Sequence, residues 1–402
     1  NSLFLVTDVL VLTVSGQDQS GVTAGLTEAL SNLPLTVRQL EQIVLQGHLV
    51  LGMAVQSTTD DSVLEQAVIT AKAFADSRQM QVDHRRVNQD DFDHRIERII
   101  VTVLGSPLVP SSISAIAKTI AGLHGNIDRI RQVANYPVTA VEFEVGGVDK
   151  LELREKLAKV ARANEIDIAV QDAGLDRRGI HLVVMDVDST FIQDEVIDLL
   201  AAKAGVAAEV SEITHRAMNG ELDFEQSLRQ RVSKLKGLTE TQVHEILDEI
   251  KLTPGAATLC RTLNRLGFHI ALVSGGFSQV VAPLAARMGV EHFRANELEI
   301  IDGVVTGNLV GPIIDRPAKA QALKDFAALH EIPMSRTVAI GDGANDLDML
   351  HSAALGIAFN AKPFVRDSAH ASVNTPYLDT VLFVLGITRD QIDRADEKSA
   401  KD

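Results

Sequence analysis

The sequence predicts an α/β protein: a Rossmann-like doubly wound parallel sheet with a helical insert, preceded by two small βαββαβ α+β domains. Three observations predict this. One strand and helix pattern occurs twice in residues 8–172, with Gly16 of the first copy aligned with Gly105 of the second. After residue 178, short apolar runs alternate with helical segments, as in a parallel sheet. Acidic and glycine-rich segments follow directly after three of those runs.

The two copies share the order strand, glycine turn, helix, two strands, helix, strand. In the first copy we expect helices at residues 21–33 and 62–76 and strands at 37–44 and 48–55. In the second copy the corresponding helices fall at 111–123 and 150–163 and the strands at 126–132 and 138–145. We therefore place one domain at residues 1–84 and the next at 98–172. We interpret the charged segment at 85–97 as a solvated linker.

Residues 180–390 follow the alternation of a parallel sheet. A β-branched and apolar run at 179–185 predicts a first strand that is buried on both faces. Helical patterns at about 194–255 predict an insert, or cap, after that strand. Further strands are expected at 269–273, 337–340 and 354–358, with helices at 278–288 and 319–329. Residues 298–310 predict a hairpin that turns at Asp302-Gly303, and residues 391–402 read as a charged tail.

Composition excludes several classes of protein. The 402 residues leave room for about two to four domains. A formal net charge of −16 disfavours nucleic acid and anionic membranes as partners. The single cysteine, Cys260, cannot form an intramolecular disulfide and lies in an apolar stretch, so we expect a buried thiol in a reducing cytoplasm. Residues 3–14 are apolar but contain Asp8 and lack a basic flank, so we expect neither a signal peptide nor a membrane span.

Two carboxylates follow the first strand of the predicted parallel sheet. Asp186 and Asp188, within the segment Asp-Val-Asp-Ser-Thr, would lie at the carboxyl edge of the sheet, where such sheets bind ligands. In an extended loop the alternation would point both side chains to one side. One carboxylate could then attack phosphorus while the other, kept protonated, donates a proton to the leaving oxygen. Taken alone, the segment also fits a solvated turn or a helix cap.

Three further elements have the chemistry of a phosphoryl site. Ser274 and Gly275, at the end of the next strand, offer a hydroxyl and a backbone amide to phosphoryl oxygens, although a tight turn would look the same. Lys319 opens a helix and could supply one positive charge, or it could simply be solvated. Residues 341–346 (Gly-Asp-Gly-Ala-Asn-Asp) offer oxygens to a hard cation, the alternative being an acidic loop. Together with Asp186, these elements favour a magnesium-dependent phosphomonoesterase.

The stretch 180–390 resembles the haloacid dehalogenase superfamily and, within it, the phosphoserine phosphatase family. The resemblance depends on residues 186–195 (Asp-Val-Asp-Ser-Thr-Phe-Ile-Gln-Asp-Glu), 223–231 (Asp-Phe-Glu-Gln-Ser-Leu-Arg-Gln-Arg), 273–277 (Val-Ser-Gly-Gly-Phe) and 341–346. The second of these segments is the one that discriminates this family within the superfamily. The resemblance implies a haloacid dehalogenase fold and hydrolysis of O-phosphoserine, the last step of serine biosynthesis, through an aspartyl-phosphate intermediate.

The resemblance also implies a role for each residue. Asp186 would be the nucleophile and Asp188 the general acid and then the general base. The other residues would hold the phosphoryl group (Ser274, Lys319, Asn345), hold Mg²⁺ (the carboxylates of Asp186 and Asp342 and the backbone carbonyl of Asp188), or orient the site from behind (Asp346). The amino-acid end of the substrate would be read from the cap, by Glu195, Phe224 and Arg231.

The spacing of the cap residues agrees with that implication. Phe224, Leu228 and Arg231 stand at i, i+4 and i+7, so one helical face would present them together. An arginine can grip a carboxylate with two hydrogen bonds, and Glu195 could face an ammonium group, so the pair would select a zwitterion. Without the resemblance, Phe224 and Leu228 would read as core and the two charged residues as solvated. Another phosphomonoester, such as a phosphorylated homoserine or sugar, stays open as the substrate, as does a serine-sensing regulatory protein without catalysis.

Residues 8–172 resemble a pair of ACT domains, βαββαβ modules that bind amino acids and commonly associate side by side. In the first copy Gly16, Asp18 and Gly21 have the Gly-x-Asp-x-x-Gly form expected at the first strand-to-helix turn, where a carboxylate and helix amides could hold an amino acid. A plain turn with a helix cap is the alternative. Residues 105–110 of the second copy contain no aspartate. We therefore expect a serine effector site in the first copy only, and a homodimer assembled through these modules.

Overall fold

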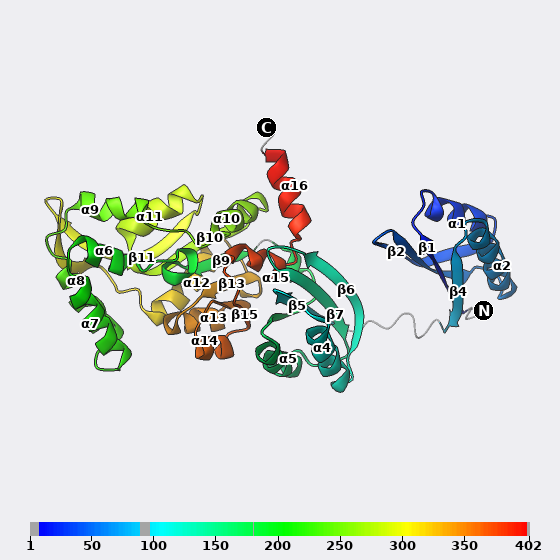
Figure 1. The fold of residues 1–402 in the computed structure, drawn as a ribbon, viewed down its shortest axis with the longest axis horizontal. Helices are drawn as coiled ribbons and strands as arrows, with labels where there is room; N and C mark the ends of the chain where they lie inside the picture. The colour runs from blue at the N-terminus through cyan, green and yellow to red at the C-terminus, as the bar shows by residue number, and fades with distance from the viewer. Residues whose placement is uncertain (1–7, 89–96, 180, 400–402) are drawn as a thin grey trace. The chain divides into compact units, whose positions relative to one another are not determined.

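The structure of the chain is a computed structural model that describes residues 8–88, 97–179 and 181–399 (Figure 1). The chain forms two compact units, Asn1–Ile96 and Glu97–Asp402. Within the described residues, no helix combines the length and the apolar content that crossing a membrane requires.

The first unit is a four-stranded antiparallel sheet with two helices packed on it. Its strand order is β2-β3-β1-β4, and Leu26 and Leu64 of the helices are buried in its core. The elements in chain order are β1 (Val9–Gln17), α1 (Val22–Leu30), β2 (Leu35–Leu45), β3 (His48–Ser57), α2 (Ser62–Ser77) and β4 (Gln81–Val87). The predicted βαββαβ pattern is confirmed.

The predicted linker begins too early. β4 continues to Val87, which pairs with Val9 of β1, so residues 85–87 belong to the sheet. Their charges misled the prediction because β4 is an edge strand, where polar side chains can stay in water while the backbone pairs. Of the predicted linker, residues 89–96 lie outside the described part of the chain.

The second unit begins with the second βαββαβ domain. It has the same strand order as the first, β6-β7-β5-β8, which confirms the internal repeat. Its elements are β5 (Arg98–Gly105), α4 (Pro110–Gly122), β6 (Asn126–Ala134), β7 (Thr139–Gly146), α5 (Lys150–Asn164) and β8 (Asp167–Asp172).

The rest of the second unit is the predicted doubly wound sheet. Its parallel strands, numbered by their order along the chain, lie in the order 3-2-1-4-5-6, that of a Rossmann-like sheet. These strands are β9 (Leu182–Asp186), β10 (His269–Phe277), β11 (His292–Ile301), β13 (Thr337–Gly341), β14 (Leu355–Phe359) and β15 (Ala371–Val373). β12 (Val304–Val310) folds back antiparallel on β11, and Asp302 and Gly303 form the predicted turn with φ of 51° and 74°.

Helices cover both faces of this sheet. Val183 and Met185 of the central strand pack in one core with α10 (Ala256–Arg265) and α11 (Ser278–Arg287). Leu182 and Val184 face the opposite core, with α12 (Arg316–Leu329) and α13 (Leu347–Ser352). This alternation explains why residues 182–185 of this strand are all apolar. α14 (Pro363–Ser368) joins the second core through Val365.

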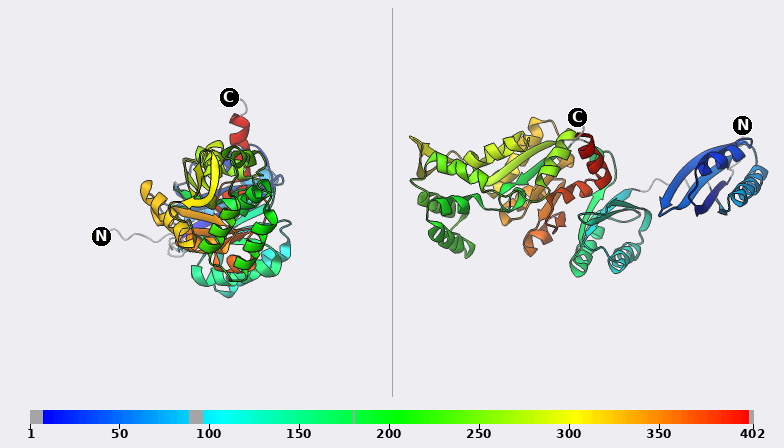
Figure 2. Two further views of the ribbon diagram at one scale, coloured as in Figure 1. Left: turned by 90° about the vertical axis from the view of Figure 1, so that its left-hand side faces the viewer. Right: turned by 45° about the horizontal axis from the view of Figure 1, so that its top comes forward.

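The predicted insert is helical and packs on the hairpin. It consists of α6 (Val196–Lys203), α7 (Ala207–Met218), α8 (Phe224–Lys234) and α9 (Glu240–Glu245). Backbone hydrogen bonds from Gly237 N to Val305 O and from Val305 N to Leu238 O join it to β12. Figures 1 and 2 show these helices and the second βαββαβ domain at opposite ends of the second unit.

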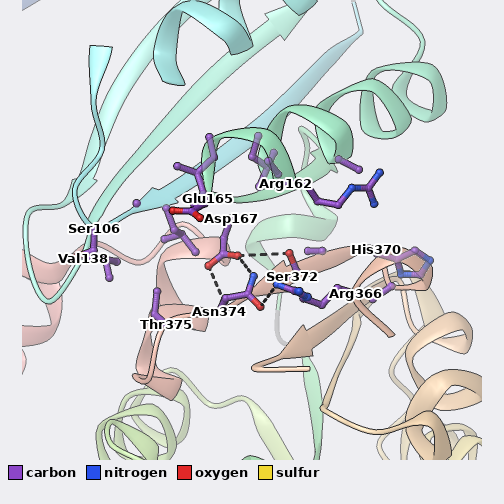
Figure 3. Close-up of a pocket in the computed structure, with 18 of the residues that line it drawn as sticks. Ser106, Val138, Arg162, Glu165, Asp167, Arg366, His370, Ser372, Asn374 and Thr375 are labelled. Atoms are coloured by element: carbon purple, nitrogen blue, oxygen red, sulfur yellow. Dashed lines mark hydrogen bonds between the residues drawn. The ribbon is translucent and has the colours of Figure 1, made fainter. Parts of the chain in front are cut away.

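The sheets of the second βαββαβ domain and of the doubly wound domain are continuous. β15 pairs antiparallel with β8 through Ala371 and Ala169, which makes one sheet of 11 strands. Beside this joint the buried carboxylate of Asp167 accepts hydrogen bonds from the backbone N and side-chain Nδ2 of Asn374 (Figure 3). Burial raises the pKa of Asp167 to about 6. A cavity of about 830 Å³ opens at the same joint between the two domains.

The charged tail predicted at 391–402 is largely a helix. α16 (Arg389–Ser399) buries Ile392, and Arg389 pairs with the buried Asp379. Arg261 of α10 holds Asp396 through two hydrogen bonds. The sequence did not indicate this helix, because only one of its side chains is apolar and buried and its ion-pair partners lie far away in the sequence. Residues 400–402 are outside the described part.

Candidate active site

Asp186 and Asp188 lie at the carboxyl edge of the sheet, as predicted. Asp186 is the last residue of β9, and the chain then makes a tight turn in which Ser189 has a φ of 56°. The turn directs both carboxylates into one cavity. Asp188 Oδ1 accepts the backbone N–H of Val196 at 2.7 Å, and its Oδ2 accepts the Ser274 hydroxyl at 2.9 Å. The first carboxylate is thus at the strand end and the second is held against the start of the cap.

The glycine loop after β10 packs directly against Asp188. Ser274 is fully buried, and its Oγ accepts the backbone N–H of Gly276 at 2.7 Å. A Cβ on Gly276 would lie 2.9 Å from that Oγ and 3.1 Å from Asp188 Oδ2, so only glycine fits without a shift. Buried Asn296 fixes the loop from β11, because its Nδ2 donates to Gly275 O at 2.8 Å. No pattern in the sequence indicates this role of Asn296.

Lys319 is the buried charge of the site and not a solvated lysine. Asp315 caps α12 by accepting the N–H of Ala318 at 2.9 Å, which places Lys319 in the first turn. Its side chain is 1% exposed, and Nζ donates to Asp186 Oδ1 at 2.6 Å and to Asp346 Oδ1 at 2.7 Å. Burial by itself would lower the pKa of Lys319, but the two carboxylates raise it above its ordinary value. Lys319 therefore stays cationic.

The loop after β13, residues 341–346, contributes Asp342 and Asp346. With Asp186 they form a group of carboxylates that we call the acidic edge. Asp346 is fully buried and accepts the N–H of Gly343 at 2.9 Å. Asp342 accepts the hydroxyl of Thr190 at 3.1 Å, a contact that the sequence did not reveal. Oxygens of Asp186, Asp342 and Asp346 lie within 4.8 Å of one another. Asp346 already binds Lys319 and a backbone amide, which agrees with its predicted role behind the site.

The site holds more negative than positive charge. Burial, and then the charge of Asp346, raises the pKa of Asp186 well above its usual value, and the same two causes raise that of Asp342 to about 6. Burial also raises the pKa of Asp188. Among the described residues, Lys319 is the cation that forms ion pairs within this group of carboxylates, with Asp186 and Asp346. Hard oxygen donors in such excess fit a divalent cation, whose charge would offset their repulsion.

The predicted substrate-reading residues line the same cavity. It measures about 160 Å³, which suits one small molecule, and it is bordered by both sides of the site: Asp186, Asp188, Glu195, Ile197, Phe224, Leu228, Arg231, Gly275, Gly276, Asp342, Gly343 and Asn345. α8 begins with a capping box between Asp223 and Gln226, so Phe224, Leu228 and Arg231 do share one helical face. Ser274 and Lys319 are not among the lining residues because they support Asp188 and Asp186 from behind.

Glu195 and Arg231 have unusual surroundings for charged groups. Glu195 is exposed at the mouth of the cavity, yet the neighbouring protein desolvates its carboxylate, which with the charge of Asp188 raises its pKa to about 7. The Ser189 hydroxyl donates to Glu195 Oε1 at 2.7 Å. Arg231 Nε is buried and has no hydrogen-bond partner among the described residues. Burial lowers the pKa of Arg231, and Asp198 and Glu195 oppose that effect.

Comparison with known proteins agrees with this geometry. Residues 183–351 match the haloacid dehalogenase-like hydrolases, and residues 8–83 and 99–171 each match an ACT domain. The chain is 50% identical to the phosphoserine phosphatase of Streptomyces coelicolor, over 96% of this chain and 94% of the relative. It is 46% identical to that of Mycobacterium tuberculosis, over 96% and 95%. The chain belongs to the phosphoserine phosphatase family.

Solved structures agree in fold. A probable phosphoserine phosphatase from Vibrio cholerae matches with a TM-score of 0.57 at 32% identity, over 75% of this chain and 89% of that one. A haloacid dehalogenase family hydrolase from Salmonella enterica serovar Typhi matches with a TM-score of 0.62 at 28% identity, over 71% and 98%. Family membership makes the chain an enzyme with a haloacid dehalogenase fold and two ACT domains, as the sequence predicted.

The effector motif of the first ACT domain lies at the predicted turn. Gly21, with a φ of 84°, precedes α1, a conformation that favours glycine. Asp18 is exposed, and its backbone N–H donates to Gly47 O at 2.8 Å, which fixes the loop that leaves β1 after Gln17. Gln19 Nε2 reaches Arg78 O at 3.1 Å. Whether this loop binds an amino acid stays a prediction.

Proposed function

We propose that this member of the phosphoserine phosphatase family hydrolyses O-phosphoserine to serine and phosphate, the last step of serine biosynthesis. The observation that supports it best is the buried, unpartnered Nε of Arg231 in the cavity that Asp186 also lines. A buried N–H without a hydrogen-bond partner is costly, and a substrate carboxylate could bind the guanidinium of Arg231 bidentately. Glu195 lines the same cavity and suits the ammonium group of the same substrate.

The chemistry assigned to Asp186 and Asp188 follows from their surroundings. Asp186 would attack phosphorus in line and form an aspartyl phosphate, with Lys319 stabilising charge on the phosphoryl oxygens. Asp188, whose pKa is raised, can hold a proton and give it to the seryl oxygen. As a carboxylate it would then take a proton from the water that cleaves the acyl phosphate. Ser274 holds Asp188 in place at 2.9 Å.

The acidic edge fits Mg²⁺, which we propose as the cofactor. The carboxylates of Asp186 and Asp342 and the backbone carbonyl of Asp188 would hold it, and Asn345 lies on the same cavity wall, where it would contact the phosphoryl group. When bound, Mg²⁺ would supply positive charge to the phosphoryl oxygens. We also infer a reducing, cytoplasmic setting, because the one cysteine of the sequence, Cys260, is a buried free thiol.

Replacement of Arg231 by alanine should separate substrate recognition from chemistry. We expect kcat/KM for O-phosphoserine to fall by about 10²-fold, because the substrate carboxylate loses a charge-assisted, bidentate partner. Phenyl phosphate, which has no carboxylate, should lose much less. The measurement is phosphate release with both substrates, with and without Mg²⁺, beside Arg229→Ala as a control from the exposed face of the same helix. An equal loss of kcat/KM for both substrates would contradict the proposed role of Arg231 in binding the substrate carboxylate. A higher rate with a phosphorylated homoserine or sugar than with O-phosphoserine would support one of these alternative substrates.

The pH dependence of kcat/KM should report the ionisation of the Glu195 carboxylate. Its carboxylate binds an ammonium group only when ionised, and its pKa is about 7. We therefore expect kcat/KM for O-phosphoserine to fall as the pH drops through 7, relative to kcat/KM for phenyl phosphate, whose phosphate ionises in the same range but which lacks the ammonium group. The ratio of the two substrates should lose this dependence in Glu195→Gln. A ratio that keeps its inflection in that variant would show that another group titrates.

We propose that serine regulates the enzyme through the first ACT domain, at Gly16, Asp18 and Gly21. The exposed carboxylate of Asp18 would bind the ammonium group of an amino acid. The backbone N–H groups at the start of α1 would bind its carboxylate. Calorimetry on the full chain with Arg231→Ala, which weakens binding of the product serine at the active site, should detect serine binding that Asp18→Ala abolishes. Binding that is the same with and without Asp18 would place the effector elsewhere.

We also propose a homodimer through the ACT domains. β2 is an edge strand of eleven residues, and Val37, Ile43 and Leu45 on it are 54%, 58% and 70% exposed. A long, apolar edge strand is normally covered by another chain. Light scattering on Ile43→Lys should give a lower mass than on the unchanged chain. A monomer mass for the unchanged chain would exclude the proposal.

A further inference from the structure

Three histidines and a glutamate gather at the amino edge of the doubly wound sheet, the edge opposite Asp186. His269 begins β10, and Glu291 and His292 stand at the start of the neighbouring strand β11. His330 directly follows the last residue of α12. The four side chains thus come from three different elements. None of them belongs to the site described above.

The donor atoms of these side chains converge. Nε2 of His292 lies 2.6 Å from Nε2 of His330. Glu291 Oε2 lies 3.6 Å from the same atom of His292 and 3.5 Å from Nδ1 of His269. His269, Glu291 and His330 can each offer one ligand atom within 4.8 Å of the others. In a tetrahedral zinc site with bonds of about 2.0–2.1 Å, neighbouring donors are about 3.3 Å apart. The separations of 2.6, 3.5 and 3.6 Å are close to that spacing.

The cluster is both supported and accessible. The His292 ring stacks on buried Phe326 of α12, with 5.4 Å between the ring centroids, so its direction is fixed. The His269 ring stacks on His330 at 3.7 Å and must turn out of this stack to offer Nδ1 to a shared ion. The side chains of His269 and His292 are 31% and 20% exposed, which allows an ion to enter.

We propose that His269, Glu291, His292 and His330 bind a zinc ion. Imidazole nitrogens with one carboxylate suit Zn²⁺, whereas Mg²⁺ prefers oxygen ligands and belongs at the acidic edge. The ion would tie the start of β10 to the end of α12. β10 ends in the loop of Ser274, and α12 begins near Lys319, so the ion stabilises the two elements that deliver these residues to the active site.

Cobalt binding tests this proposal on the full chain. Co²⁺ is the spectroscopic probe for a zinc site, and an excess of Mg²⁺ keeps it from the acidic edge. We expect one equivalent of Co²⁺ with the visible absorption of a tetrahedral ion, displaced by Zn²⁺, and a rise of several degrees in Tm on Zn²⁺ addition. The variants are His330→Ala, the double variant His292→Ala with His330→Ala, and His244→Ala as a control at an exposed histidine of the cap.

The variants distinguish the two metal sites. His330→Ala should weaken Co²⁺ binding by at least tenfold, the double variant should abolish it, and His244→Ala and Asp186→Asn should retain it. Unchanged binding in the double variant, or loss of binding in Asp186→Asn, would overturn the proposal, as would an unchanged chain that binds no Co²⁺. His330 caps a helix end and is not in the core, so its replacement should leave the fold intact and keep the test informative even if the double variant unfolds.

Discussion

Replacement of Asp186 by asparagine is expected to reduce turnover by a factor of about 10⁴ or more, because an amide cannot attack phosphorus and form the acyl phosphate. The variant should nevertheless fold. The raised pKa of Asp186 means that the folded protein disfavours its ionised form, so a neutral side chain of the same shape removes repulsion with Asp346. Lys319 keeps Asp346 as its partner at 2.7 Å. We therefore expect a Tm equal to that of the unchanged protein or higher.

Phosphate release from O-phosphoserine and thermal melting measure the two effects separately. Asp390→Asn, at an exposed aspartate of α16 that pairs with Arg394, is the matched control and should change neither. More than about 1% residual activity in Asp186→Asn would exclude it as the nucleophile, since that loss is too small for a missing covalent step. A large drop in Tm would show that the loss of activity reflects unfolding and leaves the nucleophile unidentified. In that case Asp188→Asn tests the chemistry from the second carboxylate. We expect this variant to lose activity without a drop in Tm.

The parts of this protein that the sequence predicts well are those fixed by local patterns. The apolar run that ends at Asp186 is buried on both faces, and this alone specifies a central strand and places the carboxylate at the edge. The face of α8 is specified in the same way by its spacing and capping box. Gly276 and Gly341 also follow from local sequence, because each avoids a collision with a residue nearby in the chain. A Cβ at Gly276 would collide with Ser274, and one at Gly341 would collide with Asp346.

The parts that it does not predict depend on contacts between distant segments. Asn296 is one of many amides in the sequence, and only the fold brings it to Gly275 O. The pairing of β8 with β15 depends on a three-residue strand whose pattern is too short to recognise. The α16 helix has a single buried apolar residue, Ile392, and depends on ion pairs with α10. The deep burial of Lys319 belongs to the same class, since nothing around it in the sequence distinguishes it from an exposed lysine.

The burial of Lys319 predicts the largest effect of a substitution on the free energy of unfolding. Lys319→Met keeps the length and volume of the side chain but leaves the carboxylates of Asp186 and Asp346 buried without their cation. Removing one member of a buried ion pair costs about 3–5 kcal/mol, so we expect a clear fall in Tm at pH 8. Activity should fall by about 10³-fold as well, because a positive charge beside the phosphoryl group is lost. Lys324→Met, at an exposed lysine of the same helix, is the control and should leave both unchanged.

The pH dependence of this loss identifies its cause. Without Lys319 the pKa of Asp186, which burial and the charge of Asp346 already raise, must rise further above that of the unfolded chain. A folded-state pKa that is raised in this way contributes stability at low pH, and the contribution is lost as the pH rises through it. The difference in Tm between Lys319→Met and the unchanged protein should therefore shrink from pH 8 to pH 5. Adding Asp346→Asn to Lys319→Met should restore part of the stability without restoring activity. A deficit that is the same at both pH values would mean that lost packing, and not the unpaired carboxylates, destabilises the variant.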